Sequence, residues 1–296
     1  MNDCTFEELR SLGEKAVHAG RLEEAEALFD QALGWAQEQG EPWQIDLGVC
    51  NRAAVRIELG RGESELSRLR EILLRNANPH NCQLGAYNIS RYYELTKNYK
   101  KSLFYARIAL ERAETLGRRD WMASSHNRIG NVLLAESFVD EACQRYETAL
   151  ALMAEGHGVW RAGILDNLGY CRILQRRYPE GYSLLYESLR TLRRFGSQRY
   201  LVPPLLDLSF AHIETGRYEQ ARRHAAAALR IADQTEQTDA IKNALYLLGE
   251  AANLSGDTEA AQDHFIRLQR EFFPNASYLP SFLMTVDIRK MINLHA

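Results

Sequence analysis

The chain has 296 residues and a formal net charge of -3, and 46% of its residues are hydrophobic. This composition excludes a disordered chain and a collagen-like one, and no apolar run reaches the ~20 residues that a spanning helix needs. The first ten residues are polar and acidic, so they predict no export signal. The five cysteines are odd in number and widely spaced, which fits neither a disulfide framework nor a zinc site. We therefore expect reduced thiols in a cytoplasmic protein.

A small residue recurs about every 40 residues along the chain. The positions are Gly13, Ala53, Ser90, Gly130, Gly169, Ser209 and Gly249. A second small residue follows twelve positions later in most units and a bulky one four beyond it, as in Ala142 and Tyr146. The second unit departs from this pattern, because Arg52 and Glu65 replace an apolar and a small residue. Turn signals separate the two columns, and apolar residues recur at helical spacing on either side, so each unit predicts a helical hairpin.

The predicted helices form seven hairpins in one domain over residues 1–274. The hairpins lie near residues 5–39, 42–75, 79–117, 119–154, 158–196, 198–235 and 238–272. Residues 275–296 then form a capping helix, with an amphipathic stretch near Pro280 to Leu294. A cap is expected because the last hairpin of such an array leaves an apolar face bare. The alternative is a detachable helix that binds a partner or dimerises.

The columns resemble those of the tetratricopeptide repeat (TPR), most clearly in "HNRIGNVLLAESFVDEACQRYETAL" (126–150). The period near 40 is longer than the usual ~34. It is similar to the repeats of kinesin light chain, of Rap-type regulators and of the sensor domains of bacterial transcription activators. The resemblance implies an all-α fold, a right-handed TPR superhelix (α-solenoid), in which the first helix of every hairpin lines the concave surface.

Polar and aromatic side chains gather on the stripe that the first helices would present to that surface. Asparagine amides both donate and accept, so they suit the backbone of an extended ligand, and arginines suit carboxylates. The predicted partner-binding groove comprises Asn51, Tyr87, Asn88, Arg91, Asn127, Arg128, Asn131, Asp166, Asn167, Tyr170, Phe210 and Tyr246. The alternative for Asn51, Asn88 and Asn167 is that they bond the neighbouring hairpin.

Charge is unevenly distributed along the chain. Residues 1–64 carry 6 basic and 13 acidic side chains, residues 65–200 carry 21 and 14, and residues 201–296 carry 9 and 12. The basic side chains of residues 65–200 either lie on a solvated rim or form a binding surface for an acidic partner. They also allow a homo-oligomer in which acidic first hairpins meet the basic side chains of another copy. A nucleic-acid partner is not expected, because the chain is not basic overall and has no motif of that kind.

No motif for nucleotide binding, metal binding or a catalytic nucleophile occurs in the sequence. We therefore expect no enzyme, no cofactor, no metal and no membrane contact. The sequence favours a non-catalytic scaffold that binds a peptide or an acidic segment of a partner protein. The alternative is a regulatory module that senses a peptide or small effector and acts through a separate output partner.

Overall fold

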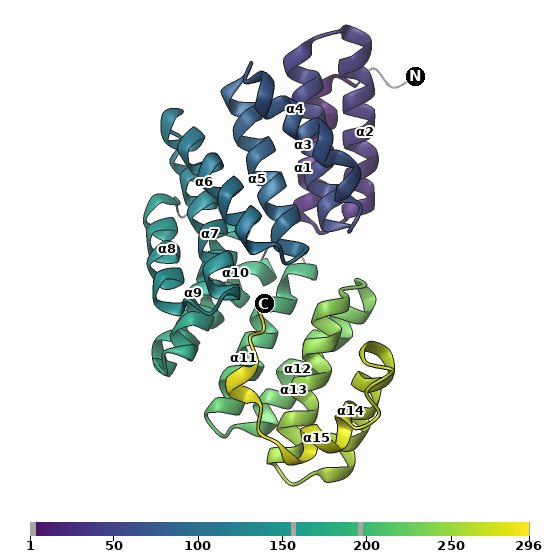
Figure 1. Cartoon of the computed structure of the whole chain (residues 1–296), viewed down its shortest axis with the longest axis vertical. Coiled ribbons are helices and arrows are strands. Elements are labelled where there is room, and N and C mark those ends of the chain that lie inside the picture. The colour runs from purple at the N-terminus through teal and green to yellow at the C-terminus, as the bar shows by residue number, and fades with distance from the viewer. Residues whose placement is uncertain (1–3, 155–157, 195–197, 296) are drawn as a thin grey trace. The chain divides into compact units, whose positions relative to one another are not determined.

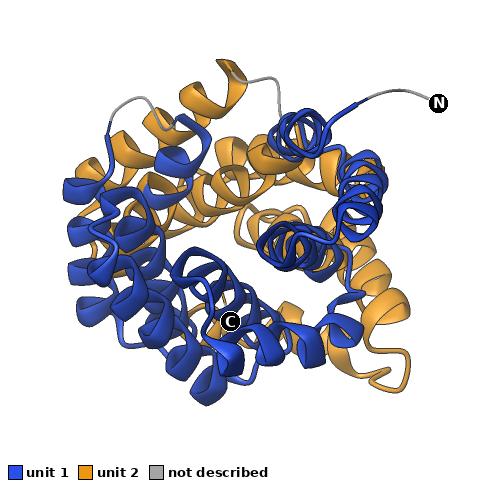
Figure 2. Cartoon of the chain, turned by 90° about the horizontal axis from the view of Figure 1, so that it is seen from above, with its two compact units in different colours: residues 1–164 blue, residues 165–296 orange. Residues whose placement is uncertain are grey.

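The computed structural model describes residues 4–154, 158–194 and 198–295. Fifteen α-helices and no strand occur among these residues (Figure 1). The chain divides into two compact units, residues 1–164 (unit 1) and residues 165–296 (unit 2), and the boundary falls inside α9 (Figure 2). None of the described helices is both long and apolar enough to cross a membrane. The all-α repeat fold is confirmed, while the single domain over residues 1–274 remains a prediction.

Unit 1 consists of four hairpins and the start of a ninth helix. Its helices are α1 (Phe6–His18), α2 (Leu22–Gln39), α3 (Pro42–Glu58), α4 (Leu66–Arg75), α5 (Pro79–Leu95), α6 (Tyr99–Thr115), α7 (Arg119–Ala135), α8 (Val139–Leu152) and the first turns of α9 (Gly158–Leu174). A short 3-10 turn, η1 (Gly62–Glu65), precedes α4. Consecutive helices pack against one another, as expected for hairpins joined by short turns.

Helix boundaries in unit 1 follow local chemistry. Thr5 and Glu8 form a reciprocal capping box at the start of α1. Gly20, after α1, adopts a φ of 75°, a left-handed conformation that costs glycine little. The turn between α5 and α6 uses a residue other than glycine. Lys97 takes the left-handed conformation, and the Asn98 side chain accepts a hydrogen bond from the Lys101 N–H at the start of α6.

The small residues are required by contact between the two helices of a hairpin. A Cβ atom added to Gly130 would lie 2.6 Å from a ring carbon of Tyr146, and one added to Gly249 would lie 2.4 Å from a ring carbon of Phe265. Each bulky ring therefore occupies the space that a side chain on the small residue would need. This contact explains why the two columns keep a fixed separation along the chain.

The two departures in the second hairpin compensate for each other. The Glu65 side chain is buried, with 1% of the residue exposed, and it accepts a hydrogen bond of 2.9 Å from Arg52 and one of 2.7 Å from Arg56. A buried carboxylate is tolerated when it is paired in this way. The polar pair replaces the usual small contact, and the second α-helix of this hairpin begins at Leu66, directly after η1.

Unit 2 contains the rest of α9 and six further helices. They are α10 (Tyr178–Arg194), α11 (Val202–Glu214), α12 (Tyr218–Gln234), α13 (Thr238–Leu254), α14 (Thr258–Phe272) and α15 (Leu279–Thr285). The 3-10 turns η2 (Arg199–Leu201) and η3 (Arg289–Met291) lie before α11 and after α15. The first helices α11 and α13 contact each other directly. They form what we call the first-helix face of unit 2, together with the residues of α9 that belong to this unit.

The predicted capping helix is shorter than the sequence suggested. A short helix, α15, packs on α14 and α13 and buries Leu283. However, α15 ends at Thr285, and Val286 is extended with a ψ of 119°. The expectation of a helix to residue 294 is wrong. The Asp287 side chain accepts the Arg289 N–H, and such local bonds compete with helical ones.

Candidate functional site

The chain segment after α15 returns across the first-helix face of unit 2. This segment, Val286–His295, is called the tail here, and Figure 1 shows it in yellow, running from α15 to the C label beside α11. It contacts five side chains of that face. These are Tyr170 of α9, Asp207 and Glu214 of α11, and Asn243 and Glu250 of α13, which together are called the tail site.

The tail backbone is held at Leu294 from both sides. The Leu294 N–H donates to the Tyr170 hydroxyl at 3.2 Å, and the Leu294 carbonyl accepts from Asn243 Nδ2 at 3.2 Å. Just before the tail, the Met284 carbonyl accepts from Asn253 Nδ2 at 3.3 Å. Two asparagine amides of α13 thus each donate to a main-chain carbonyl, Asn243 near the end of the tail and Asn253 just before its start. Backbone groups carry no sequence information, so these contacts suit any segment that places its main chain as the tail does.

His295 occupies a polar and aromatic subsite. Its ring stacks on Tyr170 with a centroid separation of 4.5 Å and an interplanar angle of 21°. Its Nε2 lies 2.9 Å from one oxygen of Asp207 and 3.2 Å from the other. Asp207 is only 1% exposed, and Phe210 packs against Tyr170 at 5.7 Å. The subsite therefore combines a buried carboxylate with two aromatic rings, a combination that holds a flat cation.

Arg289 occupies a second acidic subsite. Its guanidinium lies 3.5 Å from Glu250 and 3.8 Å from Glu214, and it also pairs with Asp287 of the tail at 2.6 Å. The bond from Arg289 lowers the pKa of Asp287 to about 2. Burial raises the pKa of Glu250 to about 7, against the opposing effect of Arg289. The arginine thus compensates only part of the cost of burying Glu250.

Two further carboxyls near His295 also resist ionisation. Burial raises the pKa of Asp166, and the negative charge of Asp207 raises it further. Burial likewise raises the pKa of Asp207, although the imidazole of His295 opposes that shift. Carboxyls held in this way destabilise the folded state when they ionise, and an approaching cation relieves that cost. The carboxyls on the first-helix face of unit 2 therefore favour the binding of a cation.

Five predicted site residues lie in unit 2. Tyr170 contacts the tail directly, and Phe210 packs against its ring. Asp166 is buried beside these groups, and its Oδ1 accepts no hydrogen bond within the described part of the chain. Tyr246 lies one turn before Glu250 on α13, and its buried hydroxyl has no hydrogen-bond partner among described residues. Asn167 lies on α9 and has interactions of its own.

The other seven predicted residues lie in unit 1, and several of them are engaged with one another. Arg128 is 6% exposed and pairs with Glu94, while its guanidinium stacks 4.6 Å from the Tyr87 ring centroid. Arg91 pairs with Glu94 at 2.9 Å and with Glu58 at 2.6 Å. Burial raises the pKa of Glu94, but the two arginines outweigh it and lower that pKa overall. The arginine stripe is thus an ion-pair network that spans α3, α5 and α7.

The asparagines of unit 1 also have local roles. Asn88 Nδ2 donates to the Cys50 carbonyl at 2.7 Å, which is the neighbouring-hairpin bond weighed as an alternative. Asn131 Nδ2 donates to Glu94 at 3.1 Å and its Oδ1 accepts from the Tyr146 hydroxyl at 3.1 Å. Asn127 has contacts of its own, and Asn51 Nδ2 is buried without a hydrogen-bond partner among the described residues. Of the twelve predicted residues, seven therefore lie in unit 1 and five in unit 2.

Sequence reasoning missed most of the tail site. Asp207 and Glu250 stand in the same repeat columns as the predicted residues, so the columns were a usable signal. Asn243 lies outside those columns, and nothing in the tail sequence marks Arg289 or His295 as contacts of the face. Those contacts depend on where a non-helical segment turns back.

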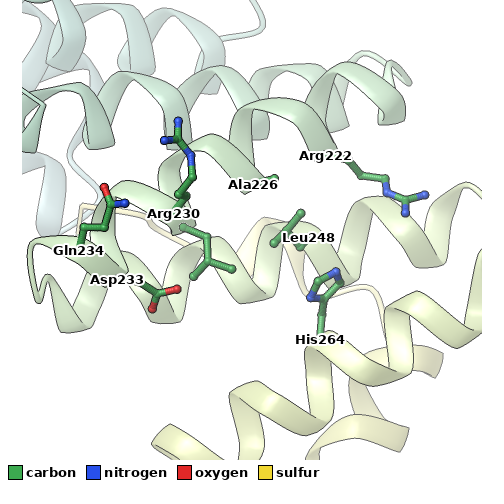
Figure 3. Close-up of a pocket in the computed structure, with 8 residues that line it drawn as sticks. Arg222, Ala226, Arg230, Asp233, Gln234, Leu248 and His264 are labelled. Carbon is green, nitrogen blue, oxygen red and sulfur yellow. The ribbon is translucent and has the colours of Figure 1, made fainter.

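A pocket of about 620 Å³ opens elsewhere in unit 2, between α12, α13 and α14 (Figure 3). Its lining includes no predicted residue. Arg222 pairs with Asp257 at 3.0 Å, and Asp233 pairs with Arg267 at 3.1 Å, so these charges are already compensated. No group of three or more His, Cys, Asp or Glu side chains suited to a metal occurs in the described ranges.

Comparison of the fold places the chain among known repeat proteins. No protein-family profile and no protein of curated function matches the sequence. One similar structure is a signal-transduction ATPase from Pyrococcus horikoshii with a tetratricopeptide repeat sensor, at a TM-score of 0.56 and 17% identity over 93% of this chain and 44% of the other. The chain has a TPR fold.

Two further TPR-like structures match most of this chain. A Rap protein complexed with competence and sporulation factor gives a TM-score of 0.72 at 14% identity, covering 96% of this chain and 78% of the other. Aspartyl phosphate phosphatase F from Bacillus subtilis gives a TM-score of 0.59 at 14% identity, covering 91% and 76%. At such identities the likeness defines the TPR fold of this chain alone.

Proposed function

We propose that this TPR protein is a non-catalytic interaction module that binds a segment of a partner protein on the first-helix face of unit 2. The observation that carries the proposal is the tail itself, an irregular segment with one 3-10 turn that is seated on that face. Its main chain is bound by the Tyr170 hydroxyl and by the Asn243 amide. A face that binds one main chain in this way has the chemistry to bind another.

The composition of the face supports the same conclusion. The rings of Tyr170, Phe210 and Tyr246 belong to this face and are buried with the tail in place, and aromatic rings of this kind dominate the energetics of protein interfaces. Asp166 and Tyr246 each bury a polar atom without a hydrogen-bond partner in the described ranges. A buried polar group without a partner costs stability, and a ligand that bonded either atom would recover that cost.

The acidic partner segment predicted from the sequence remains a prediction for unit 1. Arg91 and Arg128, its proposed receptors, are already neutralised by Glu58 and Glu94. An incoming carboxylate would have to displace these pairs and leave their own carboxylates unpaired, which is costly for buried groups. The proposal therefore places the binding site in unit 2 rather than on the arginines of unit 1.

The alternative function is that of a sensor, and two observations favour it. One similar structure is a Rap protein in complex with a competence and sporulation factor, and another carries a tetratricopeptide repeat sensor. In addition, the tail of this chain is seated on the same face, and a tail that left the face when a ligand bound would transmit binding to an output partner. Both functions use the same face and differ in whether the tail moves.

A photocrosslinking experiment tests the proposed function on the intact chain. A library of displayed dodecapeptides is selected on immobilised protein, and enriched peptides are resynthesised with a photoreactive residue. Mass spectrometry then maps their crosslinks. We expect crosslinks in residues 165–174, 202–214 and 238–254, the first-helix segments of unit 2. Failure to enrich any peptide, or crosslinks confined to other helices, would overturn the proposal.

A further inference from the structure

We infer that the tail site selects a segment with two basic side chains six residues apart, folded like the tail with a 3-10 turn at the first of them, and that the tail is its resident occupant. This inference rests on the proposed function of the face. A basic segment of a partner protein would bind by displacing the tail. The side chains and main chain of the tail thus indicate the chemistry that a ligand of this site would have.

The spacing comes from the two acidic subsites. His295 lies against Asp207, and Arg289, six residues earlier, lies against Glu250 and Glu214. Between them, the Leu294 main chain is fixed by Tyr170 and Asn243. Charge at two points selects the segment, and the main-chain bonds fix its register.

The subsite that holds His295 could accept more hydrogen bonds than the tail donates to it. Asp166 is 4% exposed, and its Oδ1 has no hydrogen-bond partner among the described residues, although Asp207 beside it is engaged by His295. The imidazole of His295 presents one nitrogen, Nε2, to the two oxygens of Asp207. A guanidinium has five donors in a planar fork, so it would bond Asp207 and still have donors to offer to Asp166. An arginine at this position would therefore bind more strongly than the histidine of the tail.

The tail is held weakly enough to be displaced. Arg289 approaches its two glutamates only to 3.5 and 3.8 Å, and its closest carboxylate is Asp287 of the tail itself. The side chains of Met291 and Val286 are 82% and 42% exposed, so they add little buried area. An external segment with a second basic residue in place of Asp287 would not divert Arg289 in this way. The tail site thus favours a basic segment, and the tail that occupies it can be replaced.

Titrating affinity with peptides tests the inference on the full chain. The probes are a fluorescent peptide with the sequence of residues 286–296, a version with His295→Arg, and a version with Glu at positions 289, 290 and 295. The proteins are the wild type and a variant with Arg289→Ala and His295→Ala in its own tail, in which the resident occupant is weakened. Fluorescence anisotropy reports each dissociation constant, and circular dichroism confirms that the variant is folded.

We expect the variant to bind the unmodified peptide at least about tenfold more tightly than the wild type does, because an occupant present ~90% of the time raises the apparent dissociation constant by that factor. The His295→Arg peptide should bind the variant more tightly still, and the charge-reversed peptide should not bind. Adding Asp207→Asn to the variant should weaken binding about tenfold, whereas adding Glu259→Gln, an exposed residue of α14, should not.

Equal affinity for wild type and variant, or equal affinity for the normal and charge-reversed peptides, would overturn the inference. If the dodecapeptides of the preceding section crosslink to the first-helix face while no basic peptide binds, the proposed function stands and the basic specificity fails. If the dodecapeptides do not crosslink there either, the proposed function itself fails.

Discussion

Replacing Glu250 with glutamine should stabilise unit 2 at neutral pH. Glu250 is 3% exposed, and burial raises its pKa to about 7 from an ordinary value of 4.5. Between those pH values the folded chain keeps a proton that the unfolded chain has lost, so stability falls as pH rises. Each pKa unit corresponds to about 1.4 kcal/mol, so the ionised carboxylate costs up to about 3 kcal/mol above pH 7.

Urea denaturation at pH 5, 6, 7 and 8, followed by circular dichroism, measures this effect. We expect Glu250→Gln to gain up to about 3 kcal/mol over the wild type at pH 8 and little at pH 5. The exposed Glu259→Gln of the next helix should change stability by less than about 0.5 kcal/mol at every pH. A Glu250→Gln chain that is less stable than the wild type at pH 8, or that keeps the full pH dependence, would refute the reasoning.

The remaining predictions concern packing and ion pairs. Gly249→Ala places a Cβ 2.4 Å from Phe265 and should cost about 1–3 kcal/mol in urea denaturation, whereas Gly34→Ala meets nothing within 4 Å and should gain up to about 1 kcal/mol. Equal effects of the two substitutions would contradict the packing of the small column. Glu94→Gln leaves buried Arg128 without its counterion and should cost about 3 kcal/mol or more, measured in the same way. A neutral effect would mean that the network is not structural.

The repeat could be predicted because its cause is local. A glycine that faces a ring sixteen residues later, as Gly130 faces Tyr146, leaves a fixed spacing in the sequence. The same spacing recurs in Gly249 and Phe265. Because the two helices of each hairpin pack through the same contact, the spacing repeats along the chain, and the repeat predicts the fold class.

Residues that break the repeat pattern were harder to interpret, because each is explained only by its contact with a second such residue. Arg52 and Glu65 each break a column, and only their mutual ion pair shows that the hairpin is intact. The same limit applied to Arg91 and Arg128, which occupy a binding stripe by position. Glu94 stands three residues after Arg91, so part of this network was visible in the sequence as a helical pair.

The tail site could not be predicted from periodicity. Apolar spacing from Pro280 onward favours a helix, and the chain leaves that helix at Thr285 because other contacts are available to it. Leu294 and His295 meet Tyr170 and Asp207, which lie some 90 to 125 residues earlier in the sequence. Contacts at such separations are set by how the hairpins stack and leave no local pattern.

Hydrogen exchange at the Leu294 amide tests most directly whether the tail occupies the first-helix face. In a uniformly ¹⁵N-labelled chain, the account predicts that this amide is protected by its bond to the Tyr170 hydroxyl. Protection should be lost when the His295→Arg peptide is added in excess. Exchange at the rate of the free 286–296 peptide, both before and after the addition, would contradict the account.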